Sequence, residues 1–472
     1  MPNERPNILL IMSDEHNPAY AEPYGHPFVR TPNLQRLARE GVVFDSFSCN
    51  SPLCVPSRMS FMTGRYASQV GSFDLGCTLS SDHPTWAHLL ASAGYDTALC
   101  GKMHFNGTDQ LHSFRRRPIE DVTGAGTPDV FPNWSDAKGV WPFRELILQG
   151  GHVDDGTAYK KGSVAYDRRV HEHAVQYLEQ YAVSSREHPF CLVAGYYAPH
   201  WPYACEQRYW NLYWPDYADL PRHPMPPEHP VYRRLQEMAG LDETIDDMQI
   251  RRCRAAYYGL VTSLDDHIGG LLDTMDRLGL AEDTVVIYTS DHGEMLGERG
   301  LWGKEVLLEG ANRVPFIARW PGHFPSARRV SAVASLVDLT ATLLDLSGTE
   351  PPPWVEGASI LPLLCGDDVP WKGQAFSEYL AHGVIHPQCS LRRGRYKLNL
   401  FAGEGCELYD LHDDPDELHD LALVSEYRPV VADLTAAIPP WWNATSLESL
   451  ILESQALRRC TRAGSHALAK SL

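Results

Sequence analysis

The feature that most constrains the fold of this chain is the alternation of short apolar runs with longer amphipathic segments. The apolar runs are short enough to be buried strands, and they cover residues 7–12, 42–47, 95–100, 190–196, 285–289 and 315–319. The segments between them have helical periodicity, and the longest, 246–278, repeats apolar side chains at spacings of three and four. Strands that alternate with helices predict an α/β fold, in which a large, mostly parallel sheet has helices on both faces.

A different pattern follows the three prolines at 351–353. Short strand-like runs separated by polar turns predict a small antiparallel sheet, and the tail from 446 to 472 has helical character. The runs are 375–379, 389–392, 396–400 and 407–410. A chain of 472 residues can hold one large core and a smaller one. We therefore predict an α/β domain at 1–365 and a C-terminal subdomain with a helical tail at 366–472.

Several predicted strands end in residues that can do chemistry. Parallel α/β sheets bind their ligands outside the carboxyl ends of the strands, so residues at those ends are expected to lie close together. The residues in question are Asp14, Lys102, His200 and Asp291.

A further candidate lies in the stretch Cys54-Val-Pro-Ser-Arg58. Pro56 suits a first helical turn and Gly64 suits a helix end, so Cys54 is expected at the N-terminus of a short helix. Free N–H groups at such a terminus attract anions, and Arg58 adds a positive fork one turn later. The stretch therefore predicts a site for an oxyanion beside a reactive side chain. The alternative for any lone cysteine is an inert core residue.

The strand-end carboxylates are also candidate metal ligands. Asp14 and the pair Asp291-His292 offer hard oxygens, which favour Ca²⁺, Mg²⁺ or Mn²⁺, and the imidazole tilts the choice toward Mn²⁺. Either aspartate alone could be a loop cap. Acidic residues at two strand ends, together with the cysteine motif, favour a site.

Charge and cysteine usage exclude several classes of partner. The net charge of -19 argues against nucleic acid and anionic membranes, and it means that an anionic substrate needs a local concentration of cations. The 11 cysteines show no paired spacing, which is typical of reduced thiols and predicts a cytoplasmic location. No apolar stretch approaches the length of a membrane span.

These motifs resemble the sulfatase family of the alkaline-phosphatase-like superfamily. Cys54 to Arg58 matches the signature C-x-(P/A)-x-R, and four other segments look like sulfatase segments in the same order: 7–14, 101–105, 199–202 and 290–293. The segment 297–304 looks most like choline-sulfatases. The resemblance spans nearly the whole chain.

The resemblance implies a set of catalytic roles. Cys54 would be oxidised to formylglycine by a maturation enzyme, and one oxygen of the hydrated aldehyde would attack sulfur while Arg58 stabilises its charge. Lys102 would bridge the nucleophile and the sulfate, and His104 would act as a base in the collapse step. The matching residues that hold sulfate oxygens and assist the leaving oxygen are His200 and Lys304.

The resemblance also implies one divalent metal ion, Ca²⁺ or Mn²⁺. The family places an acidic or amide residue directly after the first aspartate, which makes Glu15 a further candidate ligand. The implied metal set is Asp14, Glu15, Cys54, Asp291 and His292.

Three functional hypotheses follow. The first is a sulfuric ester hydrolase that releases inorganic sulfate and an alcohol from a small-molecule ester, either choline sulfate or an aryl or alkyl sulfate. The second is a phosphonate monoester or phosphodiester hydrolase of the same superfamily. The third is a non-catalytic binding protein on a sulfatase scaffold, against which the intact set of catalytic candidates argues.

The resemblance to choline-sulfatases suggests how an alcohol could be recognised. Glu378 lies in a Ser-Glu-Tyr segment similar to one that supplies a choline-contacting carboxylate, and aromatic walls would favour a quaternary ammonium. The candidate walls are Trp134, Trp141 and Tyr203. The tail at 454–459 resembles the start of a choline-sulfatase tail that helps to build tetramers, so a homo-oligomer is expected.

Overall fold

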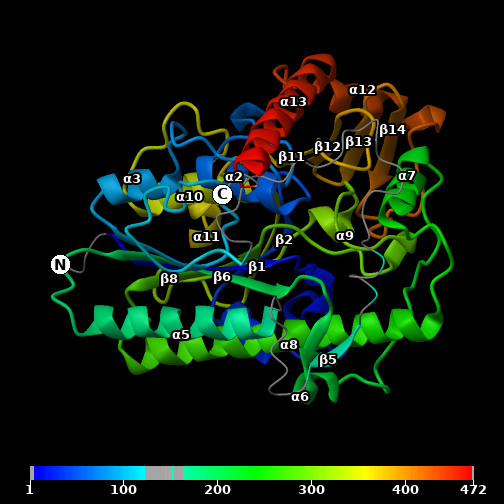
Figure 1. Cartoon of the computed structure of the whole chain (residues 1–472). Coiled ribbons are helices and arrows are strands. Elements are labelled where there is room, and N and C mark those ends of the chain that lie inside the picture. Colours follow the sequence, from blue (N-terminus) through cyan, green and yellow to red (C-terminus); the bar gives the residue numbers. More distant parts are fainter. Residues whose placement is uncertain (1–4, 123–143, 145–147, 149, 154–162, 470–472) are drawn as a thin grey trace.

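The computed structural model describes residues 5–122, 144, 148, 150–153 and 163–469 (Figure 1). Its main element is an eight-stranded sheet in the order β10-β2-β9-β8-β1-β6-β3-β4. The strands are β1 (Asn7–Asp14), β2 (Val42–Ser48), β3 (Asp96–Gly101), β4 (Arg116–Ile119), β6 (Phe190–Pro199), β8 (Thr284–Ser290), β9 (Phe316–Arg319) and β10 (Arg328–Ser335). All neighbours pair in parallel except β9, which is antiparallel to both β2 and β8. The predicted mostly parallel sheet is confirmed.

β1 is the central strand because its sequence is apolar on both faces. Every residue from Asn7 to Asp14 is buried, and β1 pairs with β6 on one side and β8 on the other. A strand buried on both faces needs helices above and below the sheet. Asp14 is the last residue of this strand, so the fold delivers its carboxylate to the carboxyl edge of the sheet.

Helices cover both faces of the sheet, as predicted (Figure 1). One face packs against α1 (Pro32–Glu40), α5 (Ser163–Ala182) and α8 (Asp247–Arg277), and the other against α2 (Cys54–Thr63), α3 (Trp86–Ser92), α10 (Leu336–Leu346) and α11 (Leu361–Cys365). α8 begins where the Asp246 side chain accepts hydrogen bonds from two backbone N–H groups of its first turn, a normal N-cap.

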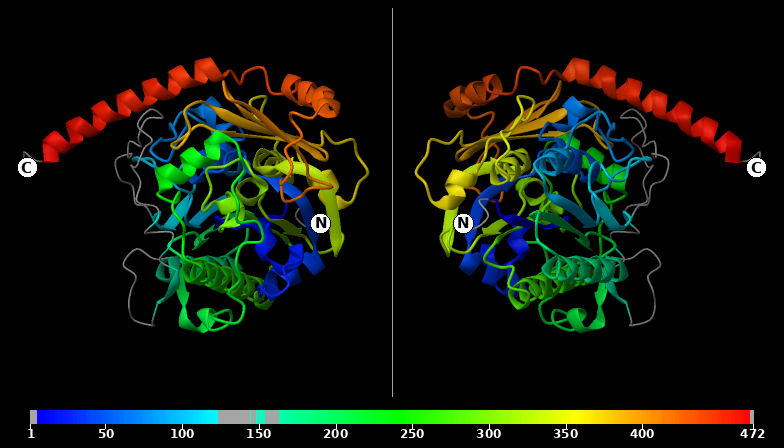
Figure 2. Two further views of the ribbon diagram at one scale, coloured as in Figure 1. Left: turned by 90° about the vertical axis from the view of Figure 1, so that its right-hand side faces the viewer. Right: turned by 90° about the vertical axis from the view of Figure 1, so that its left-hand side faces the viewer.

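The second predicted sheet is also present. β11 (Gln374–Tyr379), β12 (Gln388–Arg393), β13 (Tyr396–Phe401) and β14 (Gly405–Asp410) form an antiparallel sheet in sequence order. The tail forms α13 (Ala444–Ala469), which projects beyond the rest of the molecule (Figure 2). The second sheet and α13 both lie within 366–472, while the boundary after residue 365 stays a prediction.

The structure adds elements that the apolar pattern did not predict. β4 and β10 extend the sheet at its two edges. The remaining elements are η1 (Pro18–Tyr20), η2 (Glu22–Tyr24), η3 (Ala67–Val70), β5 (Gly151–Val153), β7 (Ala204–Glu206), α6 (Gln207–Trp210), α7 (Pro230–Ala239), η5 (Glu298–Gly300), α9 (Glu309–Asn312), η6 (Ser425–Tyr427) and α12 (Arg428–Ala436). Among the described residues, no helix combines the length and the apolar character that crossing a membrane requires.

Candidate active site

The predicted strand-end residues meet at the carboxyl edge of the large sheet. Asp14 ends β1, Lys102 follows β3, His200 follows β6 and Asp291 follows β8, and all four are buried. The Lys102 ammonium forms an ion pair with the Asp14 carboxylate, and His200 Nε2 lies 3.8 Å from Asp14 Oδ1. The parallel topology therefore gathers these side chains, as the sequence pattern predicted.

Cys54 begins helix α2, close to its predicted place at a helix N-terminus. Its Sγ lies 3.1 Å from His292 Nε2 and 3.8 Å from Asp14 Oδ1. The helix ends at Gly64, whose φ of 68° allows its N–H to donate to the carbonyl of Ser60. Burial, with a further contribution from the nearby Asp14 carboxylate, raises the pKa of the Cys54 thiol to about 12. An unmodified Cys54 is therefore a protonated thiol at neutral pH and a poor nucleophile.

Arg58, on helix α2, connects the carboxyl ends of β1, β3 and β8. Its guanidinium donates to Asp291 Oδ2 at 2.8 Å, to Asp14 Oδ2 at 3.0 Å and to the carbonyl of Lys102 at 2.9 Å. The side chain is fully buried, so its charge has to be matched by these carboxylates. This arrangement fixes both aspartates as acceptors at the edge of the sheet.

Four side chains form a candidate metal centre. The possible ligand atoms of Asp14, Cys54, Asp291 and His292 all lie within 4.8 Å of one another. His292 Nδ1 lies 3.0 Å from the carbonyl of Gly293, and donation there leaves the Nε2 lone pair facing the cluster. Two carboxylates, an imidazole and the position of Cys54 suit a divalent cation, so the residues present fit the implied metal.

Glu15 lies on a different side of Asp14 than the sequence suggested. Its Oε2 accepts a hydrogen bond from Lys304 Nζ at 2.8 Å and lies 3.1 Å from His200 Nε2. The possible ligand atoms therefore form two sets that share Asp14. One set contains Cys54, Asp291 and His292, and the other contains Glu15 and His200. Lys304 binds Oε2, while Oε1 is buried and has no hydrogen-bond partner among the described residues, so the metal contact of Glu15 stays a prediction.

Lys304 and His200 form a proton-sharing pair beside the cluster. Lys304 Nζ lies 2.7 Å from His200 Nε2, and His200 Nδ1 lies 2.5 Å from the carbonyl of Trp201. Burial lowers the pKa of His200 well below its usual value, and the charge of Lys304 lowers it further. The pKa of Lys304 is raised despite its burial, because Cys54 and Glu15 favour the ammonium form. The proton of the pair therefore belongs to Lys304.

His104 lies two residues after Lys102, and within the described part of the chain it makes no hydrogen bond to the cluster residues. The backbone N–H of His104 donates to Asp121 Oδ2 at 2.5 Å, and this hydrogen bond holds the loop after β3 in place. Burial lowers the pKa of His104 to about 3, and the positive charge of Lys102 contributes. The imidazole is thus neutral at pH 7, as a base must be.

Backbone strain is concentrated around this site. Glu15, His104 and Glu305 have φ values of 70°, 60° and 75°, in the left-handed region that residues other than glycine rarely adopt. Such conformations persist where the surroundings over-determine them, and they cluster at functional sites.

Asp167 is a supporting residue that the sequence did not reveal. It lies on α5, and its two carboxylate oxygens accept hydrogen bonds from the N–H groups of Tyr197 at 2.7 Å and Ala198 at 2.8 Å. These residues lead directly into His200. No strand-end or motif signal could have found Asp167, because it lies within a helix and acts through the backbone of β6.

The structure does not bring Glu378 into the cluster. Its two oxygens accept hydrogen bonds from the N–H of Ser68 at 2.8 Å and from the indole of Trp442 at 3.1 Å, and its side chain is buried. Glu378 therefore ties β11 to η3 and to the segment before α13, and these contacts do not support the predicted role in reading the alcohol. Of the predicted aromatic walls, Trp134 and Trp141 lie outside the described residues, and Tyr203 is buried against Tyr257.

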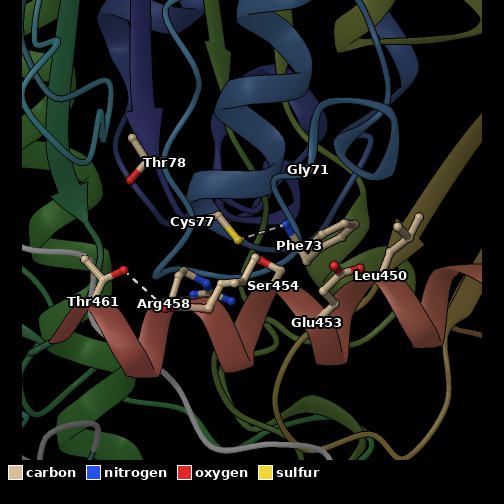
Figure 3. Close-up of a pocket in the computed structure, with 10 residues that line it drawn as sticks. Gly71, Phe73, Cys77, Thr78, Leu450, Glu453, Ser454, Arg458 and Thr461 are labelled. Atoms are coloured by element: carbon tan, nitrogen blue, oxygen red, sulfur yellow. Dashed lines mark hydrogen bonds between the residues drawn. The ribbon is translucent and has the colours of Figure 1, made fainter. Parts of the chain in front are cut away.

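A cavity of about 550 Å³ lies away from these residues, between α13 and residues 71–78 (Figure 3). Phe73, Leu450 and Leu457 line it, together with Arg458, whose guanidinium makes two hydrogen bonds to the Asp74 carboxylate at 2.7 and 2.6 Å. None of the metal-cluster residues is among those that line it.

Comparison with known proteins agrees with this geometry. The sulfatase family model matches residues 6–349, and a model described as N-sulphoglucosamine sulphohydrolase, C-terminal, matches residues 297–440. A choline-sulfatase from Rhizobium meliloti is 34% identical over 97% of this chain and 91% of its own length. A protein solved with its substrate D-glucosamine-2-N,6-O-disulfate matches with a TM-score of 0.75 at 24% identity, over 95% of this chain and 98% of that one. The phosphonate monoester hydrolase of Agrobacterium radiobacter matches with a TM-score of 0.73 at 22% identity, over 95% of this chain and 96% of that one.

The mostly parallel sheet, with the strand-end cluster at its carboxyl edge, has the fold of these two solved structures. The sulfatase family model and the choline-sulfatase each match most of this chain, and these matches identify its family. The chain belongs to the sulfatase family and is a sulfuric ester hydrolase.

Proposed function

We propose that this enzyme hydrolyses the sulfate ester of a small alcohol, with a formylglycine made from Cys54 and one divalent metal ion. The observation that carries the proposal is the position of Cys54, at the start of α2 and beside His292 and Asp14. A hydrated aldehyde at this position supplies the nucleophilic oxygen that the protonated thiol cannot. The signature from Cys54 to Arg58 is the one that a formylglycine-generating maturation enzyme would recognise.

The metal is proposed to bind between Asp14, Asp291, His292 and the modified Cys54. When bound, a divalent ion lowers the negative charge on a sulfate oxygen and favours ionisation of the nucleophilic hydroxyl. Ca²⁺ and Mn²⁺ remain the two candidates, because the donor set combines hard oxygens with one imidazole. Arg58 holds both carboxylates in place through hydrogen bonds of 2.8 and 3.0 Å.

The two lysines are proposed to bind the sulfate group. Lys102 and Lys304 are buried cations on either side of Asp14, held by ion pairs with Asp14 and Glu15. In a protein of net charge -19 they supply the local positive charge that an anionic substrate needs. His104 is proposed to accept a proton when the aldehyde re-forms, since its imidazole is neutral.

The Lys304–His200 pair is proposed to protonate the leaving oxygen. Lys304 carries the proton and His200 Nε2 lies 2.7 Å from its nitrogen, so either group can deliver it as the ester bond breaks.

The class of the ester can be tested by competition. We expect matured enzyme to release inorganic sulfate from 4-nitrophenyl sulfate with a kcat/KM above that for a matched phosphonate monoester or phosphodiester. The phosphonate hydrolase likeness keeps the second class as an alternative, but at 22% identity it supports only the shared fold. A higher kcat/KM for the phosphonate would replace the sulfatase activity by that alternative.

Choline sulfate is the proposed first substrate among alkyl sulfates, since the choline-sulfatase of Rhizobium meliloti matches nearly the full chain. Homo-oligomerisation is proposed as well, because α13 projects from the body and exposes Leu450, Leu452 and Leu457. The cytoplasm remains the proposed location, which the free state of all 11 cysteines supports.

A further inference from the structure

Lys304 directly follows a loop whose two ends are joined by one carboxyl group. Glu294 Oε1 accepts hydrogen bonds from the backbone N–H of Leu296 and from that of Gly303, each at 2.6 Å. The Glu294 side chain is fully buried, and hydrogen bonds from N–H groups to a carboxylate are among the strong ones. One oxygen of Glu294 therefore holds together the start and the end of the loop 296–303.

The conformation of this loop needs such a closure. Leu296 has a φ of 49°, in the left-handed region that residues other than glycine rarely adopt. Strain of this kind is kept only where the surrounding structure enforces it. Because the N–H of Leu296 is one of the two that Glu294 binds, loss of the carboxyl group should release the strained end of the loop.

The backbone is anchored on both sides of Lys304. Gly303, before it, is bound by Glu294, and the N–H of Glu305, after it, donates to the carbonyl of Pro52 at 3.1 Å. A lysine ammonium lies at the end of a flexible four-carbon stem, so the place where the side chain leaves the backbone limits what the ammonium can reach. Closure of the loop thus determines where the Lys304 ammonium lies.

The contacts of that ammonium are short and specific. Lys304 Nζ lies 2.8 Å from Glu15 Oε2 and 2.7 Å from His200 Nε2, and a displacement of about 1 Å at a reacting centre can cost about 10²-fold in rate. We propose that Glu294 is a positioning residue, which closes the loop 296–303 and so fixes Lys304 between Glu15 and His200. This inference rests on the proposed function, in which Lys304 supplies the proton for the leaving oxygen.

The second oxygen of Glu294 allows shape and charge to be tested separately. Glu294 Oε2 and Glu15 Oε1 are buried, and within the described part of the chain neither accepts a hydrogen bond. The two side chains are neighbours: burial raises the pKa of Glu15 well above its usual value, the charge of Lys304 opposes this shift, and the charge of Glu294 adds to it. Glu294→Gln keeps an oxygen for the two N–H groups and adds an amide donor for Glu15. Glu294→Asp keeps the carboxyl group on a side chain that is one methylene shorter.

The position of Lys304 is tested by lysine labelling, which does not depend on turnover. The full chain is treated briefly with acetic anhydride, and mass spectrometry gives the rate at which Lys304 is acetylated. We expect Glu294→Asp and Glu294→Ala to raise this rate by about tenfold or more, because the buried lysine is released when two strong hydrogen bonds are lost. Glu294→Gln should stay close to the wild-type rate.

The consequence for catalysis is measured on matured enzyme with two esters. Displacement of Lys304 should slow an alkyl sulfate, whose leaving oxygen is basic, more than 4-nitrophenyl sulfate. We expect Glu294→Asp to lower kcat for the alkyl sulfate by about tenfold more than for 4-nitrophenyl sulfate, and Glu294→Gln to keep the wild-type ratio of the two rates.

Asp265→Ala is the matched control. Asp265 on α8 is also a fully buried carboxyl group that accepts from two backbone N–H groups, those of Asn33 at 2.9 Å and Leu34 at 2.7 Å. Its loss should destabilise the fold without changing the labelling of Lys304 or the ratio of the two rates.

Wild-type labelling of Lys304 in Glu294→Asp would overturn the inference, as would an unchanged ratio of rates in that variant. Loss of function in Glu294→Gln with retention in Glu294→Asp would show that charge matters and loop closure does not. The same changes in Asp265→Ala would reduce Glu294 to a structural residue. If Glu294→Ala does not fold, the other two variants still decide. The proposed function fails separately: matured wild-type enzyme would then release no sulfate, while the labelling still reports whether Glu294 positions Lys304.

Discussion

Arg58 shows how one side chain sets the charge of the whole site. Its five donors form a rigid fork, and three of them reach Asp14, Asp291 and the carbonyl of Lys102 at 3.0 Å or less. The two carboxylates are thereby fixed side by side in a buried place, where they can hold a cation. A lysine would offer one ammonium with a different reach.

Arg58→Lys should therefore lower kcat by about 10²-fold or more, because the acceptors that shape the site lose their common donor. The free energy of unfolding should fall by about 3–5 kcal/mol, the usual cost of breaking a buried ion pair. Arg319→Lys is a matched control, since Arg319 is also buried and pairs with Glu40 and Asp276 on the far side of the sheet. Steady-state kinetics and denaturant unfolding measure both effects, and a wild-type kcat in Arg58→Lys would contradict the role given to Arg58.

His16 predicts a pH dependence of stability. Burial lowers its pKa to about 3, and its Nδ1 lies 2.5 Å from the hydroxyl of Tyr288. The unfolded chain binds a proton at His16 below about pH 6.5, whereas the folded chain binds it only below about pH 3. The contribution of His16 to stability is therefore complete above pH 6.5 and is lost as the pH falls from about 6.5 to about 3.

Between pH 6.5 and 5 the wild type should lose about 1 kcal/mol of unfolding free energy per pH unit more than His16→Gln does, because the unfolded histidine is only half protonated at pH 6.5. Urea titrations at four pH values give the two slopes, with far-UV circular dichroism as the folding signal. Identical slopes would show that His16 titrates normally in the folded protein.

At the scale of elements, the strands that could be predicted are those with a continuous apolar sequence. β1 and β8 are buried on both faces, and their apolar runs are long enough to stand out. β10 was missed because its sequence mixes exposed arginines with apolar residues, which suits a strand at the edge of the sheet. The antiparallel direction of β9 depends on how the chain returns to the sheet, and no local pattern reports that.

The residues of the candidate site also fall into those that the sequence reveals and those that only the folded packing reveals. Cys54, Arg58 and the strand-end residues were predicted because motif and topology are both readable along the chain. The hydrogen bonding of the Glu378 carboxylate depends on Trp442, which lies 64 residues away. Hydrogen-bond saturation of this kind is a property of the folded packing.

Asp167→Asn tests whether α5 positions His200 through β6. The variant loses one of the two acceptors that hold Tyr197 and Ala198, and a displaced His200 should slow esters with basic leaving oxygens by about tenfold more than esters of good leaving groups. Asp265→Asn is the control, because Asp265 on α8 accepts from Asn33 and Leu34 in the same way but caps α1. The measurement is the dependence of kcat/KM on leaving-group pKa. A purely structural Asp167 would lower all rates equally, as the control should.

At the scale of the whole molecule, the charges of the site balance without a metal. Arg58 pairs with Asp14 and Asp291, and Lys102 pairs with Asp14, so we expect the sheet and its helices to assemble without a bound cation. The metal should therefore matter for activity more than for folding.

Chelation with EDTA should abolish turnover and leave the far-UV circular dichroism spectrum unchanged. The Tm should fall modestly, because a ligand at about 100 times its Kd stabilises by about 2.7 kcal/mol. Ca²⁺ or Mn²⁺ should restore activity, and Asp291→Ala should not respond to either ion. An active preparation that metal analysis shows to be free of divalent ions would refute the metal site.

The central claim is that Cys54, once oxidised, is the nucleophile. Mass spectrometry of the peptide that contains Cys54, from enzyme made with and without a maturation enzyme, tests it most directly when sulfate release is measured on the same samples. We predict that the rate of sulfate release rises in proportion to the fraction of formylglycine, and that Cys54→Ala is folded and inactive. Full activity in samples whose Cys54 is entirely an unmodified thiol would contradict the claim.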